Sequence, residues 1–509
     1  MMIFLAEITA YNLTTSQTET LRFCTGSGYI DNASGNYYEP RIEQPCAMRR
    51  EIFGNGQIGG ASRASYGELT LINVDGGLDG LADYAFDGRS IVLKAGDDAS
   101  SYASFLTVLK ATMQQAALEY DRVSIRLRDR QATLNKPVQA LRFAGNNALP
   151  AGLEGVSDLK DVQKPLFYGR VANITPVLVN TSRLIYQLTT GALADVVNVF
   201  DKGAYLSRGA DYSSQIDMQI NAPSAGTFRV WKAGGLFRLG ATPAGQITAT
   251  AWEYGSIEDN TAAQIAYRLA TGPGGISAGD TVAADYTTLD GQNAGSIGLV
   301  VDQNMTVSDA LDQVCASVGA WWGFDQQDRF RLARFDVPSG SPAASFEQAQ
   351  ILSIERQAFA IQNDAVPVWR VVLNHDRNHT VESGEALAGV VPTDRRNWLG
   401  VQTRQSKAED AAVKTAHPLA QEVEFNTLLA GAGYAQPEAS RLLAMLKVPR
   451  FIYTVSVRAE EVATLTAVDL GAVVSIQHAR FGLSGGQLFT VVAIEPDYQT
   501  FTLTLSLWG

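Results

Sequence analysis

The chain has 509 residues, of which 46% are hydrophobic and 18% are charged, so it can bury several cores and is not a disordered tail. Its 52 acidic and 40 basic side chains give a net charge of -12. This charge argues against a protein that grips nucleic acid phosphates, because such proteins need a basic face. It keeps a protein soluble, and it also suits a surface past which nucleic acid slides without sticking.

Three cysteines, Cys24, Cys46 and Cys315, are too few for a disulfide framework in a chain of this length. None of them has the C-x-x-C spacing of a metal site, so we expect small buried hydrophobic residues in a protein assembled in a reducing cytoplasm. The first residues, MMIFLAEITAYNL, have no basic region and include Glu7, so they predict a strand rather than a signal peptide. No apolar stretch reaches the ~18 residues of a membrane span, and we expect a soluble protein.

Residues 1–165 are predicted to form a β-barrel-like domain. Apolar and polar side chains alternate at 3–10, 19–24, 37–42, 66–74, 89–94 and 123–128. The glycines from Gly54 to Gly60 allow a sharp reversal or a long loop before the strand at 66–74. The segment 101–118 is ambiguous, because its apolar residues also fall on one helical face, so we expect a strand followed by a loop or helix.

Prolines and glycines between 135 and 164 predict a loop at a domain edge. Residues 166–255 then predict a second β domain with strand-like segments LFYGRVANITPVLV, RLIYQLTTG, FRVWKAGGLFRLG and QITATAWEYG.

Residues 256–335 predict an α+β domain, because the hydrophobic period changes to that of a helix at 261–271 and 306–318. Thr306 and Asp309 have the spacing of a capping box, and Gly319 stands where the second helix would end. The following AWWGFD and RFRLARF predict a hairpin that turns at Gln326 and Gln327.

Residues 336–509 predict a second β-barrel-like domain with a helical insertion at 407–446. In the insertion, Pro437 is expected in the first turn of a helix. The clearest strand patterns in the chain follow, at 451–457 and 501–507, together with AVVSIQ and FTVVAIE. Consecutive strands of this kind favour a barrel or sandwich, so the fold class is mainly β, multidomain, with α/β insertions.

No motif predicts catalysis, a cofactor or a metal. Residues 54–59 fit G-x-G-x-x-G, but a strand pattern follows them where a dinucleotide site needs a helix. His375 and His379 have the spacing of a zinc protease, but they follow a strand pattern and are expected in a turn. Acids such as Glu253, Glu258 and Asp259 could pair as in a glycosidase, but the sequence does not give their separation.

Several phrases of the sequence resemble a family of bacteriophage tail proteins, the baseplate hub proteins of long-tailed, siphophage-like viruses. They lie within 49–94 (SYGELTLINVDGGLDGLADYAFDGRSI), at 164–176 (KPLFYGRVANITP), at 237–249 (FRLGATPAGQITA), at 377–381 (RNHTV), and at the DLG and LWG near the end.

The resemblance implies a non-enzymatic virion protein at the tail tip, assembled in the host cytoplasm. It implies a homotrimer whose two barrel-like domains per chain form a ring of pseudo-sixfold symmetry, between a hexameric tail tube and threefold tip parts. The implied partners are the distal tail protein or tail tube protein, the tape measure protein, and central fibre or receptor-binding proteins. DNA would pass through the lumen without specific binding. Some tail-tip proteins carry iron–sulfur clusters, and the sequence leaves open whether the cysteines have a cluster or redox role.

Two alternatives of other classes remain. One is a β-rich carbohydrate-binding adhesin that uses Trp231, Trp252, Trp321, Trp322 or Trp398. The other is a tail-associated cell-wall hydrolase. Glycan binding or cell-wall lysis by the purified protein would distinguish them from the hub.

Overall fold

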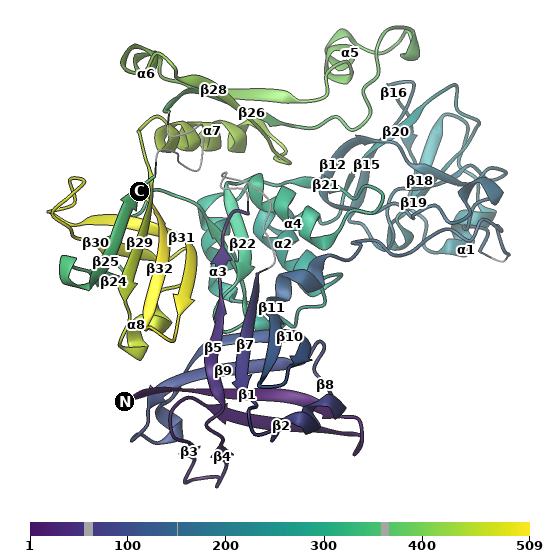
Figure 1. The fold of residues 1–509 in the computed structure, drawn as a ribbon. Helices are drawn as coiled ribbons and strands as arrows, with labels where there is room; N and C mark the ends of the chain where they lie inside the picture. The colour runs from purple at the N-terminus through teal and green to yellow at the C-terminus, as the bar shows by residue number, and fades with distance from the viewer. Residues whose placement is uncertain (55–64, 150, 358–365) are drawn as a thin grey trace.

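The computed structural model describes residues 1–54, 65–149, 151–357 and 366–509, and it is mainly β with several sheets and a few helices (Figure 1). The predicted fold class is therefore confirmed. Among the described residues, no helix is both long and apolar enough to cross a membrane. The G-x-G-x-x-G motif falls largely at 55–64, outside the described residues.

The N-terminal sheet has eight strands in the order β2-β1-β9-β10-β11-β7-β5, with β8 paired to β1. The strands are β1 (Met2–Asn12), β2 (Gln17–Cys24), β5 (Ile42–Met48), β7 (Tyr66–Ile72), β8 (Tyr84–Ala85), β9 (Ser90–Asp97), β10 (Leu106–Leu118) and β11 (Arg122–Arg128). A separate small hairpin joins β3 (Tyr29–Ile30) to β4 (Tyr37–Tyr38). The strands expected at the start of the chain and at 66–74, 89–94 and 123–128 are confirmed.

The expectation of a helix or loop within 101–118 is wrong, because β10 is continuous to Leu118. Two irregularities in β10 explain the error. Its register shifts between Thr107 and Leu109 against β9, and between Met113 and Gln115 against β11. Each irregularity moves the buried side chains by one position, so that Val108 and Leu109 are both buried and the pattern imitates a helix.

The C-terminal sheet has the order β24-β30-β31-β32-β29-β25. Its strands are β24 (Ala344–Phe346), β25 (Ile351–Arg356), β29 (Ile452–Arg458), β30 (Val473–Ile476), β31 (Gln487–Asp497) and β32 (Thr502–Trp508). The short strand β6 (Arg50–Glu51) leaves the N-terminal region and pairs with β31. The two sheets bury side chains in one hydrophobic cluster that joins Phe4 and Leu93 to Val455 and Leu505. The two ends of the chain therefore share a core, and α8 (Val462–Ala467) contributes Leu465 to it.

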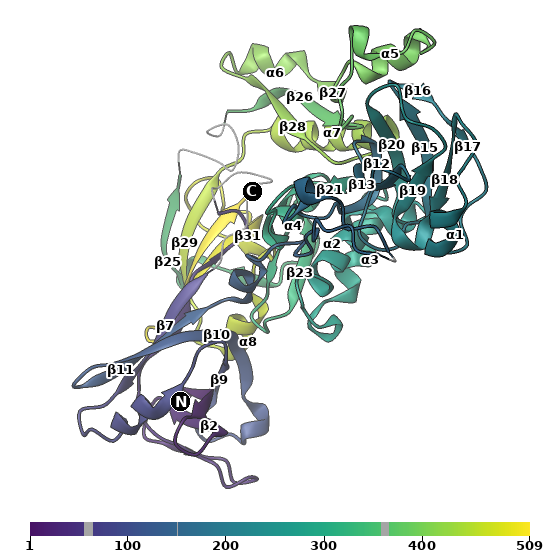
Figure 2. The same ribbon diagram turned by 90° about the vertical axis from the view of Figure 1, so that its right-hand side faces the viewer.

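Two five-stranded sheets form the unit after residue 166, in the orders β16-β15-β20-β12-β21 and β13-β14-β19-β18-β17. Their strands are β12 (Phe167–Ile174), β13 (Val177–Asn180), β14 (Ile185–Gln187), β15 (Asp195–Asp201), β16 (Ala204–Tyr205), β17 (Ser207–Arg208), β18 (Thr227–Trp231), β19 (Leu236–Leu239), β20 (Ile247–Trp252) and β21 (Gly298–Val300). A short helix, α1 (Gln215–Ile220), lies beside them at the edge of the molecule (Figure 2).

The centre of the molecule holds α2 (Ala262–Thr271), α3 (Ala283–Gln292), α4 (Val307–Ala316) and the hairpin of β22 (Ala320–Phe324) and β23 (Phe330–Arg334). The capping box is confirmed: the Thr306 hydroxyl accepts from the Asp309 amide at 3.1 Å, and Asp309 accepts from the Thr306 amide at 3.0 Å. Gly319 adopts φ 64°, as expected where a helix ends. Helix α3 was missed, because its buried residues are few.

The stretch 407–446 is not a helical insertion, which corrects the sequence prediction. It contains β28 (Gln421–Asn426), α6 (Ala411–Ala416), α7 (Ala432–Leu446) and the second half of β27 (Arg404–Glu409). Both strands flank β26 (Val368–His375) in a separate three-stranded sheet. We call this sheet, together with α5 (Thr393–Leu399), α6 and α7, the third layer (Figure 1). Pro437 lies inside α7 rather than in its first turn, because the helix begins at Ala432.

Candidate functional site

The tryptophans proposed for glycan binding are dispersed and covered. Trp321 and Trp322 are buried, and the Trp322 indole N–H donates to Asp312 at 2.7 Å. The Trp252 ring is covered by the Arg170 guanidinium at 4.2 Å, and Trp398 lies beside Arg395 and Arg404. Trp231 packs at the margin of a small hydrophobic cluster. The five side chains do not form one platform on which a sugar could stack.

The suspected histidine pair also lies apart from any helical face. His375 ends β26 and bonds through its two ring nitrogens with Asp376 at 3.0 Å and Ser406 at 3.1 Å. Burial lowers the pKa of His379, in the turn that follows, to about 4. Within the described ranges, no cluster of three metal-ligating side chains occurs.

The acids considered for glycosidase chemistry are not paired with one another. Glu253 forms an ion pair with Arg268 at 3.0 Å and accepts from the Gly169 amide at 2.7 Å, whereas Glu258 and Asp259 are exposed.

The cysteines are buried and unlinked, as predicted. Burial raises the pKa of Cys24 to about 11 and that of Cys46 to about 12, so both are thiols at neutral pH.

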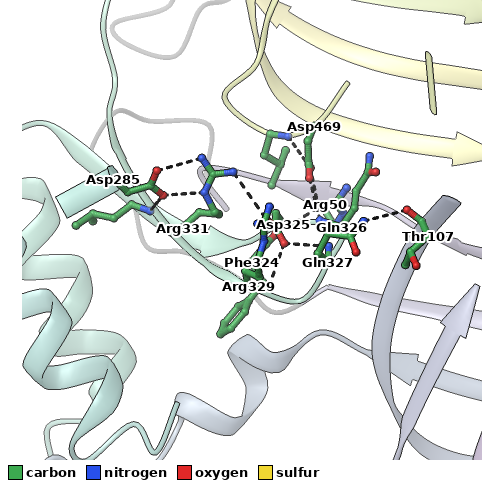
Figure 3. Close-up of polar contacts among 12 residues, drawn as sticks. Arg50, Thr107, Asp285, Phe324, Asp325, Gln326, Gln327, Arg329, Arg331 and Asp469 are labelled. Atoms are coloured by element: carbon green, nitrogen blue, oxygen red, sulfur yellow. Dashed lines mark hydrogen bonds and ion pairs between the residues drawn. The ribbon is translucent and has the colours of Figure 1, made fainter. Parts of the chain in front are cut away.

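A polar network lies where the central hairpin meets both terminal sheets (Figure 3). We call it the hairpin junction: the turn 325–329 between β22 and β23, with Arg50, Thr107, Lys110 and Asp469. The turn exists because Asp325 accepts from the amides of Gln327 and Arg329, each at 2.9 Å, and Asp328 takes φ 59°.

Gln326 inserts between the two sheets, and only 5% of it is exposed. Its carbonyl accepts from the Lys110 amide of β10 at 2.9 Å. Its amide donates to Asp469 at 2.9 Å, and its side-chain nitrogen donates to the carbonyls of Leu465 and Val468 at 3.0 and 2.8 Å. One residue of the hairpin therefore holds the N-terminal sheet on one side, and α8 with the two residues that follow it on the other.

Charged groups reinforce this contact. Buried Arg50 of β6 pairs with Asp469 at 2.7 Å and donates to the Phe324 carbonyl at 3.3 Å. On the far side of the turn, Arg331 pairs with Asp285 of α3 at 2.7 Å (Figure 3). The hairpin is thus tied to four other segments, which are β6, β10, α3 and the residues 465–469.

Two carboxyl groups, that of Asp328 in the turn and that of Asp129 beside it, are held in a poorly hydrated environment. Burial raises the pKa of Asp129 and of Asp328 to about 6, although the Arg130 guanidinium, 3.5 Å from Asp328, partly offsets the effect at that residue. The carboxylates here accept structural hydrogen bonds, so the arrangement fixes the relative position of the sheets. Sequence reasoning missed it because its members are separated by up to 419 positions, from Arg50 to Asp469.

No protein-family model matches the chain, and no curated protein matches it. Among solved structures, the chain is similar to a tail protein from Neisseria meningitidis MC58, with 10% identity, a TM-score of 0.44, and coverage of 93% of this chain and 94% of that one.

It is also similar to the 43 kDa tail protein of prophage MuSo2 from Shewanella oneidensis, with 10% identity, a TM-score of 0.41, and coverage of 100% and 98%. A prophage tail protein from Listeria monocytogenes EGD-e gives 8% identity, a TM-score of 0.37, and coverage of 99% and 94%. All three of these solved structures are of tail proteins, two of them from prophages.

Proposed function

We propose that this chain is a structural protein of a bacteriophage tail, and that it is a baseplate hub in which three copies form a ring at the tail tip. The observation that carries the proposal is the pairing of the N-terminal and C-terminal sheets around one core, locked by Gln326. Each chain thereby presents two mainly antiparallel β modules in a fixed relation. Three such chains present six similar faces, which is what an adaptor between sixfold and threefold parts requires.

The sequence resemblance falls on the same elements. The phrase SYGELTLINVDGG covers β7, DLG contains Asp469 of the hairpin junction, and LWG ends β32. These phrases therefore coincide with strands and contacts that build and hold the two modules.

In this role the ring connects the distal tail protein or tail tube to the central fibre or receptor-binding proteins, with the tape measure protein in its lumen. It closes the tail until receptor contact and then opens for DNA. The net charge of -12 supports a channel wall that DNA passes without sticking, and we expect basic side chains to avoid that wall.

Electron microscopy of the purified protein tests the proposal. We expect ring-shaped particles whose axial views have six similar lobes and threefold symmetry. Particles with one asymmetric body, together with glycan binding or lysis of cell-wall substrate, would instead favour the adhesin or the hydrolase.

A further inference from the structure

One edge of strand β10 is paired over only part of its length. Towards β9 it pairs from Leu106 to Thr112, and the last bonds on this side join Met113 to Gly88 and Arg89 at 2.9 and 2.8 Å. Beyond Met113, no backbone hydrogen bond joins this edge to any residue that the structure describes, whereas the other edge stays paired to β11 as far as Leu118. The segment 114–118 is therefore a strand with one free edge.

The direction of the free backbone groups follows from the pairing. The Glu119 amide donates to the Arg122 carbonyl at 2.8 Å, so Glu119 faces β11. Backbone groups alternate along an antiparallel strand, so those of Ala117 also face β11, and those of Ala116 and Leu118 face away. They point to the side where an additional strand would bind.

A groove of about 400 Å³ lies along this free edge. We call it the β10 groove. Buried Leu81 and Phe86 and half-buried Ala116 form its apolar floor, Leu118 is 40% exposed at its rim, and Asp87 lies at its side. A free strand edge beside an apolar floor is the arrangement that binds an extended segment by adding it to the sheet.

We infer that the β10 groove is filled by strand β25 of a second copy of this chain, which extends the N-terminal sheet of one copy with the C-terminal sheet of the next. This inference rests on the proposed function and specifies how the copies in the ring would join. β25 forms one end of its sheet, pairs only with β29 among the described residues, and has six residues, enough to match 114–118.

The side chains of β25 suit the groove. Leu352 of β25 is 49% exposed and can cover the apolar floor. Arg356 is exposed and lies over the Phe451 ring at 4.2 Å, and it forms no ion pair with a described residue. Asp87 in the groove is also exposed and forms no ion pair with a described residue, so the two charges are complementary.

Other candidate edges lack these features. β24 has only three residues, which is too short to match 114–118. β5 leads directly into β6, which pairs with the other sheet. The outer strands of the third layer, β27 and β28, have the polar sequences RQSKAE and QEVEFN, which do not suit an apolar floor. The outer end of β2 exposes mainly Gln, Thr and Glu.

Disulfide trapping tests the pairing, because the three native cysteines are buried and do not interfere. Ala116→Cys is combined with a cysteine at Leu352, Ser353 or Glu355, which samples the possible registers. At least one double variant should form covalent dimers and trimers under mild oxidation, whereas each single variant, the matched control, should stay uncrosslinked.

Light scattering provides the second readout. Leu352→Asp places a charge at an exposed site and should lower the mass of the assembly to that of one chain, as should Ala116→Pro, which removes a groove-facing N–H. The control Val390→Asp changes a residue that is 81% exposed elsewhere and should leave the mass unchanged.

The failures can be told apart. A trimer that withstands both substitutions and gives no crosslink overturns the β25 pairing but leaves the proposed ring intact, with the groove open to a different protein. A wild-type monomer that gives no crosslink overturns the pairing and counts against the ring as well.

Discussion

Replacing Gln326 by alanine tests whether the hairpin junction holds the two sheets together. The substitution removes two side-chain hydrogen bonds and leaves the buried carbonyls of Leu465 and Val468 without that donor. A buried hydrogen bond contributes about 1 to 1.5 kcal/mol. Since two bonds are lost, we expect the junction to be destabilised by about 2 to 3 kcal/mol, which corresponds to 30- to 150-fold more frequent opening.

Hydrogen–deuterium exchange measures this opening at the Lys110 amide, which donates to the Gln326 carbonyl at 2.9 Å. In the variant, exchange at the Lys110 amide should be about 30 to 150 times faster. Exchange in the remote sheet β13-β14-β19-β18-β17 should not change.

The neighbouring residue is a matched control. Gln327 is exposed and donates one side-chain hydrogen bond, to the Thr107 carbonyl at 3.0 Å. Gln327→Ala should change stability by less than about 0.5 kcal/mol. Equal effects of the two substitutions on Lys110 exchange would refute the assignment of the junction to Gln326.

Three further changes test other parts of the account. The folded-state pKa of Asp328 is raised from 3.8 to about 6, so its ionisation lowers the free energy of unfolding as pH rises through this window. Asp328→Asn removes the ionisable group and should therefore stabilise the protein by about 1 to 3 kcal/mol at pH 7. Urea unfolding at pH 7 and pH 3.5 should show this gain only at pH 7. Asparagine also tolerates the positive φ of this position, so a loss of stability at pH 7 would contradict the burial argument. Thr306→Ala removes the capping box of α4 and should cost about 0.5 to 2 kcal/mol in the same assay, while an unchanged midpoint would show that the cap is dispensable. Gly169→Ala should prevent stable folding, because its Cβ would lie 2.0 Å from the Ile297 carbonyl oxygen and the residue has φ 76°. The yield of soluble protein measures this effect. The control Gly255→Ala, whose Cβ would meet open space, should give a normal yield.

Elements with uninterrupted periodicity could be predicted from the sequence. β11 alternates throughout, β29 and β32 alternate except at one end, and α4 combines a helical period with a capping box, so local physics alone identifies them. β10 could not be identified with certainty, since its irregularities change which positions are buried. In the third layer, β28 pairs in parallel with β26, some fifty residues earlier, and no local pattern predicts such a partner.

The hairpin junction lies beyond sequence reasoning for a related reason. Gln326 was recognised as a turn residue, which is correct, but a glutamine in a turn is ordinarily exposed. Its burial depends on the position of Leu465, Val468 and Asp469, which only the folded chain brings within hydrogen-bonding distance.

The mass of the purified wild-type protein, measured by size-exclusion chromatography with light scattering, tests the central claim most directly. Three chains of 54.7 kDa give about 164 kDa, which is the mass the ring predicts. A single species of 54.7 kDa that does not change when the distal tail protein is added would contradict the hub.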